Sequence, residues 1–140
     1  MICSKRIALL LVLSLCASSA WALTGGEDVE IEDYPWMAAL LIGKGNAPGS
    51  AHFCGGALIH PSWVLTAAHC VHNRAADEFE LVFGLGSLTD APAATDRYQI
   101  AEIVVHPRYL FRDGQHDGDV ALLRLERPVV GRSPIRVLEN

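Results

Sequence analysis

Short apolar segments separated by turn-forming residues constrain the fold of this 140-residue chain more than any other feature. Apolar segments of this length with period-2 patterning predict β-strands, and no stretch carries a sustained helical period. Closing such strands into an antiparallel barrel removes unpaired sheet edges, so we expect an all-β barrel. A two-sheet sandwich fits the same periodicity. The predicted strands are Trp36–Ile42, His52–Ile59, Trp63–Thr66, Glu80–Gly84, Tyr98–His106 and Asp119–Leu125.

Alternation in the last of these segments predicts which of its side chains are buried. Ala121, Leu123 and Leu125 would share one face of the strand, and Val120, Leu122 and Arg124 the other. Between strands, Gly, Pro, Asn and Asp predict exposed loops at residues 43–49 and 88–96. We also expect one helical turn over Ala67–Val71, directly after the third strand.

The first 22 residues have the pattern of a secretory signal peptide. Lys5 and Arg6 form a basic start, an apolar run follows, and Ala20-Trp21-Ala22 resembles a cleavage site. The apolar run is shorter than the roughly 20 residues that a membrane span needs. We therefore expect a secreted protein, extracellular or periplasmic in a bacterium, whose mature N-terminus is Leu23 and which keeps no membrane attachment. Cleavage after Ala20 is the alternative.

Charge argues against nucleic acid as a partner. Of the 11 lysines and arginines, Lys5 and Arg6 lie in the signal peptide, which leaves nine basic against 16 acidic side chains. Binding to nucleic acid requires clustered Lys and Arg to neutralise phosphates. The acidic balance bears mainly on solubility.

Two cysteines, Cys54 and Cys70, remain after signal cleavage. In an oxidising compartment such a pair favours one disulfide, which the loop-entropy model credits with about 3 kcal/mol. A metal site assisted by His52, His69 or His72 is the alternative. It fits less well, because structural zinc sites usually space their ligand pairs closely: His69 and His72 are three residues apart, but Cys54 lies far from both.

Two motifs carry residues suited to nucleophilic catalysis. A serine hydroxyl becomes a good nucleophile when a histidine takes its proton and a carboxylate orients that histidine. Spacing alone selects none of the six histidines and 16 acids for these roles. The sequences Thr66-Ala67-Ala68-His69-Cys70 and Asp119-Val120-Ala121-Leu122-Leu123, however, resemble the histidine and aspartate motifs of the trypsin/chymotrypsin family of serine endopeptidases.

The resemblance extends over residues 23–140. It includes Tyr34-Pro35-Trp36, Phe53-Cys54-Gly55-Gly56, His106-Pro107-Arg108-Tyr109 and Leu123-Arg124-Leu125-Glu126-Arg127-Pro128. It implies the first of the family's two six-stranded Greek-key barrels, a Cys54–Cys70 disulfide, and protein or peptide substrates. It also implies His69 as general base and Asp119 as the orienting carboxylate, with no cofactor and no metal. Asp117 would then be an exposed loop residue and His106 a surface histidine at a strand end.

The chain departs from the family's pattern at two points. It contains no Gly-Asp-Ser-Gly-Gly segment, and Ser50, Ser62, Ser87 and Ser133 lie in other contexts. The family's second barrel supplies the serine, the oxyanion hole and the specificity pocket, so we expect residues 23–140 alone to be inactive and truncated before that barrel. The start Leu23-Thr24-Gly25-Gly26 replaces the usual Ile-Val-Gly-Gly and follows Ala22 directly, which would expose it without a separate activating cut.

Three functions follow from these observations. The leading one is a secreted serine endopeptidase, represented here by the segment that carries the histidine and the aspartate. The second is a secreted pseudoprotease, an interaction module without catalysis, although such a module has no physical need of both His69 and Asp119. The third, a secreted metal-binding β-protein, depends only on scattered histidines.

Overall fold

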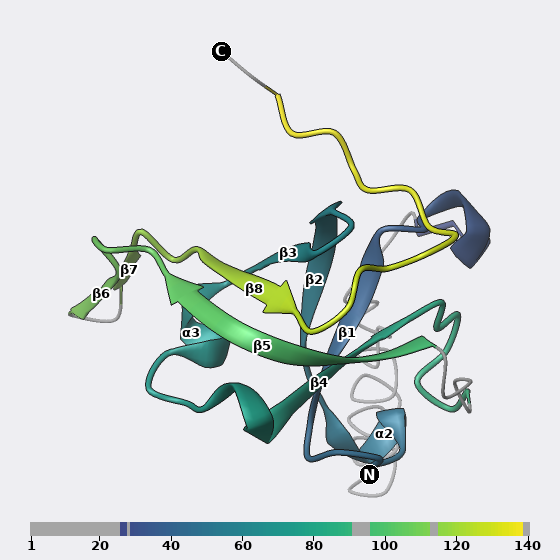
Figure 1. Ribbon diagram of the computed structural model, residues 1–140, viewed down its shortest axis with the longest axis horizontal. Helices are drawn as coiled ribbons and strands as arrows, with labels where there is room; N and C mark the ends of the chain where they lie inside the picture. The colour runs from purple at the N-terminus through teal and green to yellow at the C-terminus, as the bar shows by residue number, and fades with distance from the viewer. Residues whose placement is uncertain (1–25, 28, 91–95, 113–114, 139–140) are drawn as a thin grey trace, which may run out of the picture.

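The computed structural model describes residues 26–27, 29–90, 96–112 and 115–138 (Figure 1). The predicted signal peptide and Leu23 lie outside these residues, as does most of the predicted loop at residues 88–96. Within the described part of the chain, no helix combines the length and apolarity needed to cross a membrane.

Six antiparallel strands form one closed barrel in the order β1-β2-β3-β8-β5-β4, which closes because β4 also pairs with β1. Strands β4, β1, β2 and β3 thus adopt the 4-1-2-3 arrangement of a Greek key. The predicted all-β barrel is confirmed and the sandwich alternative is wrong. The strands are β1 (Met37–Ile42), β2 (His52–His60), β3 (Trp63–Thr66), β4 (Phe79–Phe83), β5 (Arg97–Val105) and β8 (Ala121–Leu125).

Shorter elements connect these strands. A second, two-stranded sheet pairs β6 (Leu110–Arg112) with β7 (Gln115–Asp117), and the sequence analysis did not predict it. Asp117 is exposed as expected, but it ends β7 rather than lying in a loop. The predicted loop at residues 43–49 runs into a short helix that starts at Pro48. The other elements are η1 (Ile31–Asp33), α2 (Pro48–Ala51), α3 (Ala68–Val71) and η2 (Ala76–Glu78).

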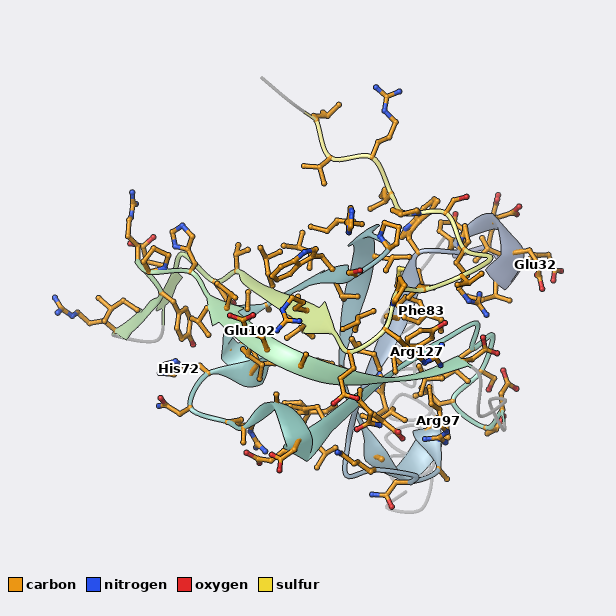
Figure 2. The ribbon with its side chains drawn as sticks, in the orientation of Figure 1. Glu32, His72, Phe83, Arg97, Glu102 and Arg127 are labelled. Carbon is orange, nitrogen blue, oxygen red and sulfur yellow. A yellow bond between two sulfur atoms is a disulfide. The ribbon has the colours of Figure 1, made fainter. Side chains whose placement is uncertain are left out.

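The barrel interior holds the main hydrophobic core, and the alternation predicted for the last strand is confirmed there. Ala121, Leu123 and Leu125 of β8 are buried, whereas Arg124 is exposed. On the outer face of the neighbouring strand, Glu102 (labelled in Figure 2) accepts a hydrogen bond of 2.8 Å from the Arg124 guanidinium. Both side chains are about half exposed, so this ion pair adds little stability.

Strand β4 is buried on both faces. Phe79, Leu81 and Phe83 belong to the core inside the barrel, whereas Val82 packs outside it against Leu41 and Ala51. Because Ala51 belongs to α2, this short helix covers the outer side of β1 and β4. The period-2 pattern is therefore weak in this segment, as it is in strands whose two faces are both covered.

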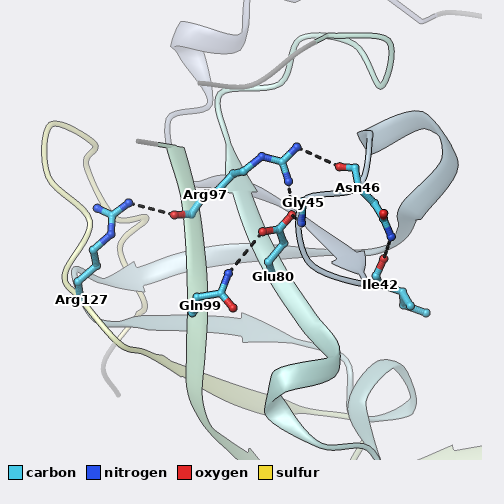
Figure 3. Close-up of polar contacts among 7 residues, drawn as sticks. All are labelled: Ile42, Gly45, Asn46, Glu80, Arg97, Gln99 and Arg127. Carbon is cyan, nitrogen blue, oxygen red and sulfur yellow. Dashed lines mark hydrogen bonds and ion pairs between the residues drawn. The ribbon is translucent and has the colours of Figure 1, made fainter. Parts of the chain in front are cut away.

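Glu80 is the buried charge of β4, and it organises the loop between β1 and α2 (Figure 3). Its carboxylate accepts from the Gly45 backbone amide at 3.0 Å and from the Gln99 side chain at 3.4 Å, and it is paired with Arg97. Arg97 also donates to the Asn46 carbonyl at 3.0 Å. A buried carboxylate needs such partners, so this network fixes the loop against β4 and β5.

Candidate active site

His69 lies on α3, the single helical turn that follows β3, as the sequence predicted. Its neighbours Ala68, Cys70 and Val71 are buried under the turn, so His69 is the residue of α3 that faces solvent. Its side chain is 49% exposed. The histidine is therefore held by buried neighbours while its ring remains accessible.

Asp119 reaches the site from a different part of the sequence. It lies two residues before β8, which pairs with β3 so that Ala121 is opposite Thr66. Since α3 begins two residues after Thr66, this register brings Asp119 next to His69 although 50 residues separate them. The pairing of β3 with β8 is thus what assembles the site.

The carboxylate of Asp119 makes two hydrogen bonds to His69. The imidazole Nδ1 lies 2.8 Å from Asp119 Oδ2, and the His69 backbone amide donates to Asp119 Oδ1 at 2.8 Å. With one oxygen held by the backbone and the other on the ring, the imidazole can neither rotate nor tilt without losing a bond. A proton on Nδ1 that is directed at a carboxylate leaves Nε2 as the nitrogen that accepts a proton.

The turn before Asp119 also contributes to its placement. Gly118 has a φ of +60°, a left-handed conformation that favours glycine, and its carbonyl accepts from the Val120 amide at 2.7 Å. His106 is exposed directly after β5, as predicted, and its backbone amide donates to the Val120 carbonyl at 2.9 Å. The sequence analysis missed Gly118, although a glycine beside a candidate acid was a usable signal for such a turn.

Cys54 on β2 and Cys70 on α3 form a disulfide, as predicted. Its sulfur atoms and a His69 ring nitrogen lie within 4.8 Å of one another. Metal ligation requires thiolates, and both sulfurs here are bonded to each other. The metal site weighed for this cysteine pair is therefore wrong. The other candidate ligand on this side, His72, packs edge-on against Tyr109 with ring centroids 5.0 Å apart.

Comparison with known proteins finds a matching family. The family model described as "Trypsin" matches residues 23–140. Granzyme M from Homo sapiens is 39% identical over 137 residues, and urokinase-type plasminogen activator from Gallus gallus is 33% identical over 114. These matches cover 94% and 77% of this chain but only 49% and 26% of the two relatives, so the chain spans half of their length or less.

Solved structures show the same fold. The secreted serine protease VesC from Vibrio cholerae aligns with a TM-score of 0.67 at 28% identity, over 82% of this chain and 24% of the VesC chain. The VesB protease of the same organism aligns with a TM-score of 0.66 over 78% of this chain and 32% of its own. At 24% identity, VesB supports the fold alone. The chain belongs to the trypsin family of serine proteases.

Proposed function

We propose that this chain supplies the general base and its orienting carboxylate to a secreted serine endopeptidase. The observation that carries the proposal is the pair of 2.8 Å contacts from His69 to the two oxygens of Asp119. In this role Nε2 of His69 takes the proton of a serine hydroxyl as that hydroxyl attacks a peptide carbonyl. The same nitrogen then returns the proton to the leaving amine.

Asp119 serves this chemistry by stabilising the imidazolium that forms when Nε2 is protonated. Its Oδ2 already lies 2.8 Å from Nδ1, so the carboxylate does not need to move as positive charge develops on the ring. The backbone bond to Oδ1 holds the carboxylate in position, since a carboxylate oxygen is a strong acceptor for an N–H donor. Protein or peptide substrates are the class that this chemistry serves.

The nucleophilic serine would come from a second barrel. Relatives at least twice as long as the matched region leave room for one, and no serine of this chain lies in a Gly-Asp-Ser-Gly-Gly context. Without a second barrel, residues 23–140 would react with no serine-directed reagent and would hydrolyse no peptide.

Apolar surface on the outside of the barrel supports packing against a second barrel. A row across three strands joins Leu65, Leu122 and Val104, which are paired in register; Leu65 and Val104 are 36% and 41% exposed. On another side, an apolar pocket of about 460 Å³ lies between the segment that includes Val29 and Ile31 and strands β1, β2 and β4. Exposed apolar side chains that lie side by side often mark an interface, and we assign the row of Leu65, Leu122 and Val104 to the second barrel.

Export would also prepare the N-terminus. Cleavage after Ala22 would release Leu23-Thr24-Gly25-Gly26 at the position where the family's mature chains begin. No separate activating cut would then be needed. Cleavage after Ala20 would leave a Trp-Ala extension that prevents this.

Sequencing of the complete transcript tests the two-barrel proposal. We expect the reading frame to continue past Asn140 to a Gly-Asp-Ser-Gly-Gly-type segment. A stop codon directly after Asn140 in every transcript would contradict it and would favour the non-catalytic secreted module. In that case purified residues 23–140 should be a soluble monomer with a sharp thermal melt.

A further inference from the structure

The segment that carries His69 has little internal support. Helix α3 is only four residues long, and its N-cap residue, Ala67, offers no side chain to bond the first amides of the helix. A turn of this length is not stable by itself. The position of His69 must therefore be set by contacts between this segment and neighbouring strands.

One of these contacts comes from the hydroxyl of Thr66, the last residue of β3. Thr66 is buried at 7% exposure, and its Oγ1 donates to the Gly55 carbonyl of β2 at 2.8 Å. The register of β2 with β3 ends at the pair Ala57–Leu65. The hydroxyl thus continues the link between the two strands at the point where the chain leaves the sheet toward His69.

Close approach of the two strands makes this contact possible. A Cβ at Gly56 would lie 2.7 Å from Val64 Cγ1 and 3.1 Å from the Leu65 carbonyl oxygen. Only a residue without a side chain fits there, so the β2 backbone comes within reach of the short Thr66 side chain. The contact therefore belongs to the way in which β2 and β3 pack.

Thr66 also joins the two strands that hold the rest of the site. Its backbone pairs with Ala121 of β8, two residues after Asp119, while its hydroxyl reaches Gly55, the neighbour of Cys54. The disulfide holds the far end of the same segment at Cys70. The His69 segment is consequently tied to consecutive residues of β2 at its start and at its end.

We propose that Thr66 is a positioning residue whose hydroxyl holds the start of the His69 segment so that His69 reaches Asp119. The inference rests on the proposed function only in naming His69 as the general base. The geometric statement is independent of catalysis. Without the hydroxyl, the disulfide still holds Cys70, but the residues between Thr66 and Cys70 gain freedom to move away from Asp119.

Hydrogen exchange at the His69 backbone amide tests this proposal, because that amide donates to Asp119 Oδ1. NMR would follow the full chain as wild type, Thr66→Val and Thr66→Ser. Valine keeps the shape of threonine without the hydroxyl, and serine keeps the hydroxyl. We expect Thr66→Val to speed exchange at His69 by about tenfold, the size of one lost hydrogen bond, while core amides such as that of Leu123 are unchanged. Thr66→Ser should retain the wild-type rate at His69.

Thr89→Val is the matched control, because the Thr89 hydroxyl bonds to Ser87, two residues away on the exposed surface. It should leave exchange at His69 unchanged. Unaltered exchange at His69 in Thr66→Val, or equal acceleration at His69 and throughout the core, would overturn the proposal. If Thr66→Val does not fold, Thr66→Ala and Thr66→Ser replace the pair: faster exchange at His69 in alanine alone supports the role, and equal rates contradict it. Since no substrate is used, an inactive full-length protein would refute the catalytic role without affecting this result.

Discussion

At the scale of single residues, the proposed chemistry depends on one carboxylate that is used twice. Asp119 binds both the ring and the backbone of His69, so its two oxygens fix the position and the orientation of the imidazole together. A carboxylate that pointed into solvent could not hold the imidazole in this way. This arrangement also means that a change at Asp119 should affect catalysis far more than folding.

Asp119→Asn should lower kcat of the full-length protein by about 10⁴-fold, the size that this change has in related triads. The amide can donate to Nδ1 only in the wrong tautomer and cannot stabilise an imidazolium. Steady-state hydrolysis of a peptide-ester panel measures the loss. Asp117→Asn, an exposed acid two positions away, is the control and should retain wild-type turnover. Equal kcat for Asp119→Asn and wild type would show that another acid orients the base.

Individual residues differ in how well the sequence predicts them. His69, Asp119 and the cysteine pair lie in compact motifs, so their identities follow from a few neighbouring letters. The motif that contains Thr66 did not reveal what its hydroxyl binds, and Gly118 was signalled only by its place beside a candidate acid. Their contributions depend on strand register and on a positive φ, which are properties of the folded backbone.

At the scale of elements, the pairing of β2 with β3 determines where α3 begins. Within this pairing, Gly56 packs closely against β3, whereas its neighbour Gly55 does not. A Cβ at Gly56 would meet Val64 Cγ1 and the Leu65 backbone, whereas a Cβ at Gly55 would meet nothing nearer than 3.8 Å. The two neighbouring positions therefore allow a matched comparison of packing at this contact.

Gly56→Ala should destabilise the barrel by about 1–3 kcal/mol, the usual cost of forcing an extra group into a packed contact. Gly55→Ala should change the free energy of unfolding by less than about 0.5 kcal/mol, because its Cβ has room. Urea denaturation of the purified chain measures both values. Equal midpoints for the two variants would contradict the packing described for β2 and β3.

The sequence pattern predicted the long strands but not the shortest elements. All six barrel strands were predicted, because each is an apolar run of adequate length with turn residues on both sides. The β6–β7 hairpin was missed, since residues 110–117 are short, mostly polar and without alternation. Helix α2 was missed for a related reason: one turn of Pro48–Ala51 carries no period that a sequence can display.

At the scale of the whole molecule, the described barrel has apolar side chains both in its core and on part of its outer face. Its core is closed, yet the row of Leu65, Leu122 and Val104 presents apolar side chains on the outside. The segment after β8 runs past the barrel and then away from it (Figure 1). The backbone amides of Glu126, Val129 and Ile135 donate to the carbonyls of Gln99, Pro61 and Leu58, which holds the segment against the barrel as far as Ile135.

The double variant Leu65→Lys/Val104→Glu should raise the solubility of the isolated chain while leaving its thermal melt within a few degrees of wild type. The charges replace outward-facing apolar groups and leave the core intact. Sedimentation across a concentration series measures self-association. Val137→Glu, a change at a 61% exposed position outside the row, is the control and should have no such effect. If the double variant self-associates as strongly as the wild type, the row of Leu65, Leu122 and Val104 is not the surface through which the chains associate.

Labelling of the full-length protein by a fluorophosphonate, which reacts with activated serines, tests the central claim most directly. We expect the wild type to be labelled, and the labelling rate of His69→Ala to fall by about 10³-fold or more, because the serine then has no base. His60→Ala, at an exposed histidine at the end of β2, should be labelled like the wild type. Equal labelling rates for His69→Ala and wild type would contradict the assignment of His69 as the general base.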